Sequence, residues 1–242
     1  MREKMLPLHL VNLKNLSILE QLQYEEALLR ADQQNWCLIN DGSLPAIVMG
    51  ISCQFDQLVD YHKLLTIPLP VIRRFSGGGT VVVDQQTIFV TFIFNSKSVP
   101  VAPFPLPIMR WTEMIYRPLF KNFPFQLKEN DYVIANKKIG GNAQSIIKNR
   151  WLHHSTFLFK YNPQLMNLLL QPSKAPPYRS NRKHEEFLAT LSLYWQSIDQ
   201  FKIELIDELK KNFLLEVVEE KKLQEILKLP HRRATTLLDW QR

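Results

Sequence analysis

The stretch that decides the fold reads Arg73-Arg74-Phe75-Ser76-Gly77-Gly78-Gly79-Thr80-Val81-Val82-Val83-Asp84. Apolar and β-branched runs flank it at residues 69–72 and 87–94, and such runs are typical of strands. Three glycines between strands expose a row of backbone N–H groups, which can form an anion-binding nest. The two arginines add permanently charged donors. A glycine-rich turn with solvated arginines is the alternative.

A second glycine cluster, Gly140-Gly141, favours a binding site. The chain of 242 residues has only seven glycines, and five of them lie in these two clusters. A chain that uses glycine so sparingly places it where a side chain is not tolerated. Lys137 and Lys138 precede the second cluster, after a turn, so strand alternation predicts that one points inward and the other into solvent. For either lysine alone, an exposed position is the alternative.

Composition restricts the class of protein. With 45% hydrophobic and 22% charged residues the chain is globular, and we expect one domain over residues 1–242. The net charge of +7 favours phosphate-bearing or acidic partners. No Walker loop, no GxGxxG motif and no RNA-binding signature is present, so no nucleic-acid partner is expected. Cys37 and Cys53 lack metal-ligand spacing, so no zinc site is expected.

The sequence also predicts a location. Residues 1–16 contain no apolar run typical of a secretory signal, and no stretch of eighteen apolar residues occurs. We therefore expect a cytoplasmic protein without a membrane partner.

Two further motifs give the glycine stretch a context. They are Lys138-Ile139-Gly140-Gly141-Asn142-Ala143-Gln144 and His153-His154-Ser155-Thr156-Phe157-Leu158. Together the three motifs resemble the lipoate-protein ligase A family, which shows RRxSGGGxVxHD, a K-I/V-x-G-x-A stretch and HHGTLL in this order. The resemblance implies a catalytic domain like that of biotin and lipoate ligases, in a short form without the C-terminal accessory domain.

The resemblance also implies an activity. Such ligases use ATP, with Mg²⁺, to convert lipoate into lipoyl-adenylate, and then transfer the acyl group to a lysine of a lipoyl carrier domain. The implied partners are the carrier domain of a 2-oxoacid dehydrogenase complex or the glycine cleavage H-protein, and a monomer is expected. Whether the acid is lipoate, octanoate or a related one stays open.

Site residues follow from their positions in the motifs. The resemblance assigns Lys138 as the catalytic residue that contacts the carboxylate and the phosphate. Attack of a carboxylate on a phosphate brings two anions together, so the catalyst mainly supplies positive charge. Asp84 and Asp131 are candidate helpers, without a metal cage of their own. The resemblance assigns the ATP and adenylate contacts to Arg74, Gly79, Thr80, Val81, Val82 and Lys138, and the acyl contacts to Ser76, Gly77, Gly78, Gly141, Ala143 and His154.

The sequence departs from the family pattern at four positions. Val83 replaces a histidine, Gln86 and Thr87 replace Gly-Asn, and Ser155 replaces the glycine of HHGT. These changes leave the lysine and the glycine loop intact, so we retain the chemistry and leave substrate and rate open.

Two other functions remain. Octanoyl and lipoyl transferases of the superfamily use a cysteine downstream of the glycine loop, and no cysteine follows Cys53. A thioester route is therefore disfavoured. A non-catalytic relative that binds an acyl group or a carrier is the other alternative. His153 or His154 could be a base for the incoming amine, although histidines beside a sheet are more often structural.

Apolar periodicity predicts an α+β fold, with a mixed, mostly antiparallel sheet and flanking helices. A capping box at Ser17 starts a helix over 18–31, in which we expect Glu25 and Glu26 to be solvated. Further predictions are a proline-rich loop over 99–107 that could act as a lid, a helix from Ile108 ending near Pro118, a strand over 151–159, a flexible basic crossing over 171–183, helices over 198–213 and 219–229, and a helical C-terminal part of the same domain over 184–242.

Overall fold

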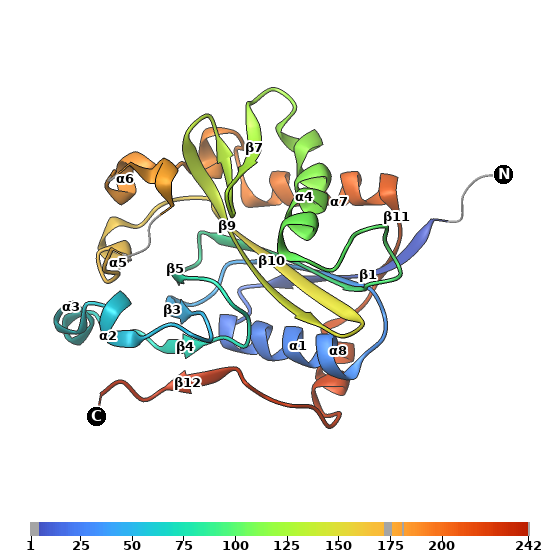
Figure 1. The fold of residues 1–242 in the computed structure, drawn as a ribbon, viewed down its shortest axis with the longest axis horizontal. Coiled ribbons are helices and arrows are strands. Elements are labelled where there is room, and N and C mark those ends of the chain that lie inside the picture. The colour runs from blue at the N-terminus through green and yellow to red at the C-terminus, as the bar shows by residue number, and fades with distance from the viewer. Residues whose placement is uncertain (1–4, 172–175, 181, 242) are drawn as a thin grey trace.

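The computed structural model describes residues 5–171, 176–180 and 182–241 and has two sheets with helices packed against them (Figure 1). The strands are β1 (Leu6–Lys14), β2 (Trp36–Asp41), β3 (Ala46–Met49), β4 (Val71–Arg73), β5 (Thr80–Val83), β6 (Thr87–Asn95), β7 (Phe125–Lys128), β8 (Asp131–Ile134), β9 (Lys137–Ile147), β10 (Arg150–Leu158), β11 (Phe213–Val217) and β12 (Thr236–Leu238). The helices are α1 (Ile18–Ala31), α2 (Phe55–Leu58), α3 (Tyr61–Thr66), α4 (Pro105–Tyr116), η1 (Arg117–Phe120), α5 (Pro163–Met166), η2 (Pro177–Arg179), α6 (His184–Phe187), η3 (Leu191–Leu193), α7 (Ile198–Asn212) and α8 (Glu220–Leu227). The predicted α+β class is confirmed.

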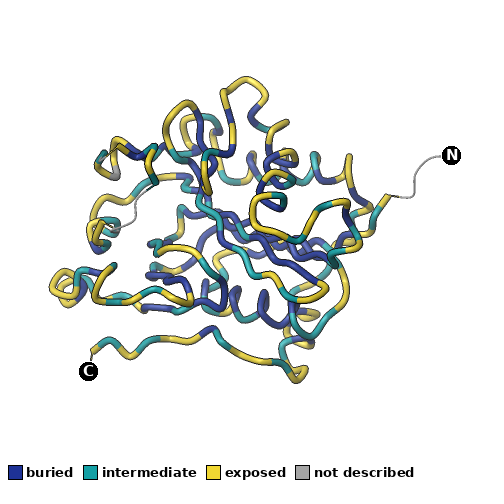
Figure 2. The backbone as a smooth tube through the Cα atoms, in the orientation of Figure 1, coloured by how far each residue is buried: buried dark blue, intermediate teal, exposed yellow. Residues whose placement is uncertain are grey.

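The large sheet has the order β11-β1-β2-β6-β10-β9-β8-β7, and the small sheet has the order β12-β4-β3-β5. Pairing is antiparallel except between β1 and β11, β1 and β2, and β3 and β4, which are parallel. Strands β2 and β6 lie inside the large sheet and are almost entirely buried (Figure 2). Their continuous apolar runs are what a strand covered on both faces requires.

Three hydrophobic clusters hold these layers together. Helices α4 and α7 pack on one face of the large sheet. Helices α1 and α8 fill the space between its other face and the small sheet, through residues such as Leu22, Leu28 and Leu223. A third cluster lies under the small sheet, between it and the short helices α2, α3 and α5. Among the described residues, no helix combines the length and apolar character needed to cross a bilayer.

Helix α1 has the predicted bounds, and Ser17 caps it by accepting from the Glu20 N–H at 3.3 Å. The expectation that Glu25 and Glu26 are solvated is wrong, because they are 0% and 1% exposed. The helix lies between two sheets, so it has no solvent face over its middle turns. Both carboxylates are stabilised by hydrogen bonds instead, as buried charges must be.

The proline-rich stretch is shorter as a loop than predicted. Helix α4 begins inside it, at Pro105, because a proline fits the first turn of a helix, where its missing N–H is not needed. The helix ends before Pro118, as expected, and continues as one 3₁₀ turn. Strand β10 and helices α7 and α8 lie within one or two residues of their predicted bounds.

We predicted a helical C-terminal part over residues 184–242, and this prediction is only partly correct. It also supplies β11, which pairs with β1, and β12, which pairs with β4. We call residues 231–241 the C-terminal strap. Glu26 anchors the strap to helix α1, because its carboxylate accepts the N–H groups of Ala234 and Thr235 at 2.9–3.0 Å. A second anchor is Trp240, whose ring nitrogen donates to the Leu69 carbonyl at 3.0 Å.

Replacing Glu26 should therefore loosen the strap. In Glu26→Gln an amide group would face N–H donors, so we expect the free energy of unfolding to fall by about 1–3 kcal/mol, measured by urea denaturation. Trypsin should also cleave faster after Arg232 or Arg233. Glu20→Gln, on the exposed side of the same helix, is the control and should change neither quantity appreciably. Equal protection of the strap in the two variants would contradict this role.

Candidate active site

The glycine bend, residues Gly77–Gly79, links β4 to β5 and lies against the large sheet. The Gly77 N–H donates to the Gln144 carbonyl of β9 at 3.2 Å. Gly78 has a φ of +105°, and a Cβ there would lie 2.6 Å from the Arg74 guanidinium. Both observations require glycine at position 78. A Cβ at Gly77 or Gly79 would meet nothing within 4 Å, so these two positions leave open space beside bare backbone.

Arg74 supports the glycine bend from inside. Its side chain is buried, and it donates to the carbonyls of Gly77 and Gly79 at 2.9 Å and to the Val48 carbonyl at 3.5 Å. Burial lowers the pKa of this guanidinium to about 10, so it remains charged at neutral pH. The donors of Arg74 are thus already used by the protein. Its assignment as a nucleotide contact stays a prediction.

The hairpin of β8 and β9 separates the two lysines as alternation predicts. Lys137 is exposed, whereas Lys138 borders a cavity and places its ammonium 2.8 Å from Asp131 Oδ1. Asp131 accepts a second bond, from the Tyr178 hydroxyl at 2.8 Å. A Cβ at Gly141 would lie 3.3 Å from the Lys138 ammonium, so glycine at position 141 gives that group its room.

A cavity of about 750 Å³ joins the motifs. It is bordered by the glycine bend and the start of β5 on one side and by β9 and β10 on the other. Every predicted site residue except Ser76 borders it. These are Arg74, Gly77, Gly78, Gly79, Thr80, Val81, Val82, Lys138, Gly141, Ala143 and His154. Ser76 is buried behind the wall, with its hydroxyl 3.4 Å from His154 Nε2.

Lys138 and His154 both border this cavity. His154 pairs with Ala143, which is five residues along β9 from Lys138. The Lys138 side chain extends toward Gly141, since a Cβ at Gly141 would lie 3.3 Å from its ammonium. His154 Nδ1 is held at 2.9 Å by Glu25, whose carboxylate also accepts from Thr91 at 2.6 Å. His154 is therefore held in place by the protein, and its assignment as an acyl contact stays a prediction.

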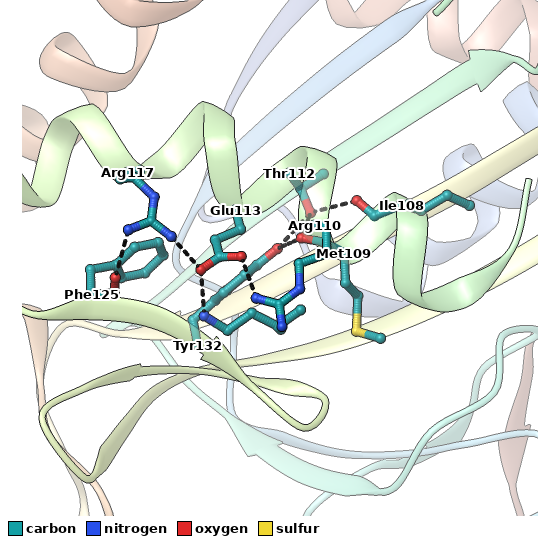
Figure 3. A network of polar contacts seen from close by, with 9 residues as sticks. Ile108, Met109, Arg110, Thr112, Glu113, Arg117, Phe125 and Tyr132 are labelled. Carbon is teal, nitrogen blue, oxygen red and sulfur yellow. Dashed lines mark hydrogen bonds and ion pairs between the residues drawn. The ribbon is translucent and has the colours of Figure 1, made fainter. Parts of the chain in front are cut away.

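His153 points to the other face of β10 and is a structural residue. It is fully buried, and its ring nitrogens contact Gln144 at 2.9 Å and Thr112 at 3.2 Å. Burial, together with the neighbouring His154, lowers its pKa to about 3, so the ring is neutral. The Thr112 hydroxyl also lies 2.5 Å from the Tyr132 hydroxyl, which connects α4 to β8 (Figure 3).

A second part of this network positions the hairpin (Figure 3). Glu113 of α4 is buried and accepts from Arg110 at 2.9 Å, from Arg117 at 2.7 Å and from the Leu127 N–H of β7 at 2.8 Å. Strand β7 pairs with β8, which begins at Asp131. Helix α4 therefore fixes the hairpin on which Asp131 and Lys138 stand.

Only one of the two candidate helper carboxylates lies in the cavity. Asp131 borders it, whereas Asp84 accepts from the Gln86 N–H at 2.8 Å and the Thr87 hydroxyl at 3.2 Å and closes a turn. Within the described ranges no three His, Cys, Asp or Glu side chains form a metal cluster. Asp131 is the one candidate helper that could face a cation in the cavity, and its two oxygens are bonded to Lys138 and Tyr178. An Mg²⁺ ion here would therefore be held mainly by phosphates and water.

The sequence reasoning missed three residues around the site. Glu25, expected in solvent, holds His154. Tyr178 and Arg179 were expected in a flexible crossing. Arg179 borders the cavity and is 5% exposed, and Tyr178 donates to Asp131. Residues 172–175 and 181 of that crossing lie outside the described residues. The only sequence signal at Arg179 is a basic residue beside an aromatic one, which is common in solvated loops.

Comparisons with known proteins agree with this geometry. A sequence profile of the lipoyl protein ligase A/B catalytic domain matches residues 17–210. The chain is 27% identical to inactive lipoate-protein ligase 2 of Plasmodium falciparum, over 77% of this chain and 64% of the relative. It is 28% identical to lipoate-protein ligase LplJ of Bacillus subtilis, over 48% of this chain and 34% of the relative. The chain thus spans less than two thirds of these curated relatives.

Solved structures share the fold. A bipartite lipoate-protein ligase of Thermoplasma acidophilum, described with its E2 lipoyl domain, superposes with a TM-score of 0.75 at 19% identity, over 92% of this chain and 91% of that one. A lipoate-protein ligase A bound with ATP gives 0.72 at 19% identity, with 93% of each chain covered. LipL1 of Plasmodium falciparum in complex with lipoate gives 0.71 at 22% identity, over 93% of this chain and 69% of that one.

The solved structures thus show that the chain has the fold of lipoate-protein ligases. The profile match covers most of the chain, and the chain belongs to the lipoyl protein ligase A/B catalytic domain family. The predicted family is confirmed.

The glycine bend provides a first test of the site. Gly78→Ala places a Cβ at a positive φ and against the Arg74 guanidinium, so we expect the free energy of unfolding to fall by more than about 1 kcal/mol in urea denaturation. Gly77→Ala is the matched control. Its Cβ meets nothing within 4 Å, and it should leave stability unchanged or slightly raised. Equal losses in both variants would refute the special role of Gly78.

His153 predicts a dependence of stability on pH. The unfolded chain binds a proton below about pH 6.5, whereas the folded ring does so only near pH 3. Stability from this residue is therefore complete above pH 6.5 and is lost as the pH falls toward 3, at up to about 1.4 kcal/mol per pH unit. His153→Gln should reduce this slope in unfolding experiments between pH 4 and 7. An unchanged slope would show that the ring is not buried as neutral imidazole.

Proposed function

We propose that the protein is an ATP-dependent lipoate-protein ligase, which activates lipoate as lipoyl-adenylate and transfers the lipoyl group to a lysine of a carrier domain. The observation that carries the proposal is the position of Lys138. Its ammonium borders the same cavity as the bare backbone of Gly77–Gly79, and the glycine at position 141 leaves it room there. The cavity is thus bordered by a cation and bare backbone, and by strands β9 and β10.

This arrangement supports a specific orientation of substrates. The acyl chain lies along β9 and β10 toward His154, and its carboxylate meets the α-phosphate of ATP beside Lys138. A carboxylate oxygen forms a bond to the α-phosphorus, and pyrophosphate leaves. Lys138 offsets the negative charge that gathers there and does not become a nucleophile. The carrier amine then forms an amide bond at the carbonyl carbon, AMP leaves, and the amine loses a proton to solvent. Mg²⁺, which we expect to arrive with ATP, would supply further positive charge to the phosphates.

The positions of the family departures are consistent with retained chemistry. Val83 is packed in the core, Thr87 bonds Asp84, and Ser155 donates to the Asn142 side chain at 2.9 Å. None of the four departing residues borders the cavity. A relative named inactive shows that the family fold does not guarantee turnover, so catalysis needs its own test.

The position of the cysteines disfavours the acyltransferase alternative. Cys37 is buried in the core, and burial raises the pKa of its thiol well above its usual range. Cys53 donates to the Gly78 carbonyl at 3.3 Å, on the side of the glycine bend away from the substrates. Neither borders the cavity, so neither thiol is placed to carry an acyl group.

Lys138→Ala tests the proposed chemistry directly. We expect the rate of pyrophosphate release from lipoate and Mg·ATP to fall by about 10²–10³, as for loss of one charge-stabilising donor. Lys137→Ala removes the same charge from the exposed face of the same strand and should react at nearly the wild-type rate. If Lys138→Ala keeps full activity, the assignment of this residue is wrong.

A second experiment separates the three functions. The full chain is incubated with lipoate, Mg·ATP and a lipoyl carrier domain. Pyrophosphate release together with modified carrier supports ligation. Modification that occurs only from an acylated carrier, without ATP, supports a transferase, and binding of lipoate without turnover supports a non-catalytic relative.

A further inference from the structure

Arg179 is a buried cation on the cavity wall that lacks a counter-ion in the protein. It is 5% exposed, yet it forms no ion pair with any described residue. Its Nε donates to the Arg182 carbonyl at 3.0 Å, and its Nη2 is shielded from solvent without a hydrogen-bond partner. Its ring contact is with Phe187, 5.1 Å from the guanidinium carbon. An arginine has five N–H donors, and the two on Nη2 have no partner among the described residues.

The contrast with Arg74 shows why this matters. Both arginines line the cavity, and both are buried. Arg74 donates to the carbonyls of the glycine bend and so stabilises the conformation of the bend. Arg179 has no such set of carbonyls. Burial, and then the neighbouring charge of Arg182, lower its pKa, and both effects would be offset by an anion in the cavity.

Arg179 is tied to the Lys138 end of the cavity. Its neighbour Tyr178 donates to Asp131, which is the ion-pair partner of Lys138. On the other side, Phe187 precedes Leu188, which forms a parallel bridge with Lys138, and the Ala189 N–H donates to the Lys138 carbonyl at 2.8 Å. The segment that carries Arg179 is thus held against Lys138 from both sides.

Of the two cations that border the cavity at this end, Lys138 has an ion-pair partner and Arg179 has none among the described residues. Asp131 compensates Lys138 at 2.8 Å. Glu129 also borders the cavity, but its carboxylate accepts the Tyr178 N–H at 3.3 Å and forms no ion pair with Arg179. Arg179 is therefore the cation left for a ligand. A planar guanidinium suits phosphate oxygens, which it can bind through two parallel N–H groups.

We propose that Arg179 binds the β- and γ-phosphates of ATP and the pyrophosphate that leaves, as the second cation beside Lys138. This inference rests on the proposed function, since it assigns a residue to the leaving group of that reaction. The bond between the α-phosphorus and the bridging oxygen breaks, and the departing pyrophosphate carries the electron pair. Arg179 stabilises that charge, whereas Lys138 acts at the α-phosphate.

The test measures binding of inorganic pyrophosphate and of AMP to the full chain by calorimetry, which requires no turnover. In Arg179→Ala we expect pyrophosphate affinity to fall by about 10- to 100-fold, the cost of losing a charged hydrogen bond, with AMP affinity unchanged. Arg179→Lys keeps the charge without the planar fork and should recover part of the affinity. Unchanged pyrophosphate binding in Arg179→Ala, or an equal loss for AMP, would overturn the inference.

A matched control separates a specific contact from general electrostatics. Lys128 lies over the Tyr178 ring at 5.1 Å and does not border the cavity. Lys128→Ala removes one positive charge from the same region and should leave pyrophosphate affinity within about twofold. An effect as large as that of Arg179→Ala would also overturn the inference.

A second assay, the exchange of labelled pyrophosphate into ATP, separates this inference from the proposed function. A wild-type chain that binds pyrophosphate but shows no exchange would disprove the proposed ligase activity and would leave the Arg179 site intact.

Discussion

Everything at the site depends on the contact between the glycine bend of the small sheet and strand β9 of the large one. The Gly77 N–H donates to the Gln144 carbonyl, and a Cβ at Gly78 would lie 3.4 Å from the Ala143 Cβ. Backbones approach this closely only where side chains are absent. The contact closes one wall of the cavity and brings Gly77–Gly79 opposite the strand that carries Lys138. A side chain at Gly78 would collide with the Arg74 guanidinium, 2.6 Å from its Cβ, and so disturb this wall.

Buried polar groups hold the rest of the site in register. Glu113, Thr112 and His153 link helix α4 to three strands, and Glu25 links helix α1 to His154 on β10. Each of these groups would be costly to bury alone, and each is hydrogen-bonded. Such networks fix the relative positions of the helices and strands, because any other arrangement would leave some of these buried groups without hydrogen bonds. Helices α1 and α4 thus help to shape the cavity through the strands that they position.

The two buried arginines of the cavity show how context divides one residue type into two roles. Arg74 is surrounded by carbonyl oxygens from the bend that it supports. Arg179 packs on an aromatic ring beside another arginine and donates to one carbonyl oxygen, that of Arg182. The charge of Arg74 is stabilised by these carbonyl oxygens, whereas the charge of Arg179 would be stabilised by an anion in the cavity. If the proposed function is right, the cavity has a distinct cation for each stage of charge development on the phosphates.

Much of this protein was determined by local sequence, and the remainder only by tertiary structure. The glycine clusters, the alternation at Lys137 and Lys138 and the cap at Ser17 have short-range physical causes, so these patterns predicted the helix start and that one of the two lysines points inward. The choice of Lys138 and most of the cavity wall came from the family resemblance of the three motifs. Glu25 and Arg179 could not be placed in this way. A carboxylate in a helix or an arginine beside prolines is usually solvated, and burial here results from a second sheet over α1 and from contacts of Arg179 with residues distant in sequence. Those long-range contacts decide which charges lie inside the protein, because the cost of burying a charge depends on every layer packed around it.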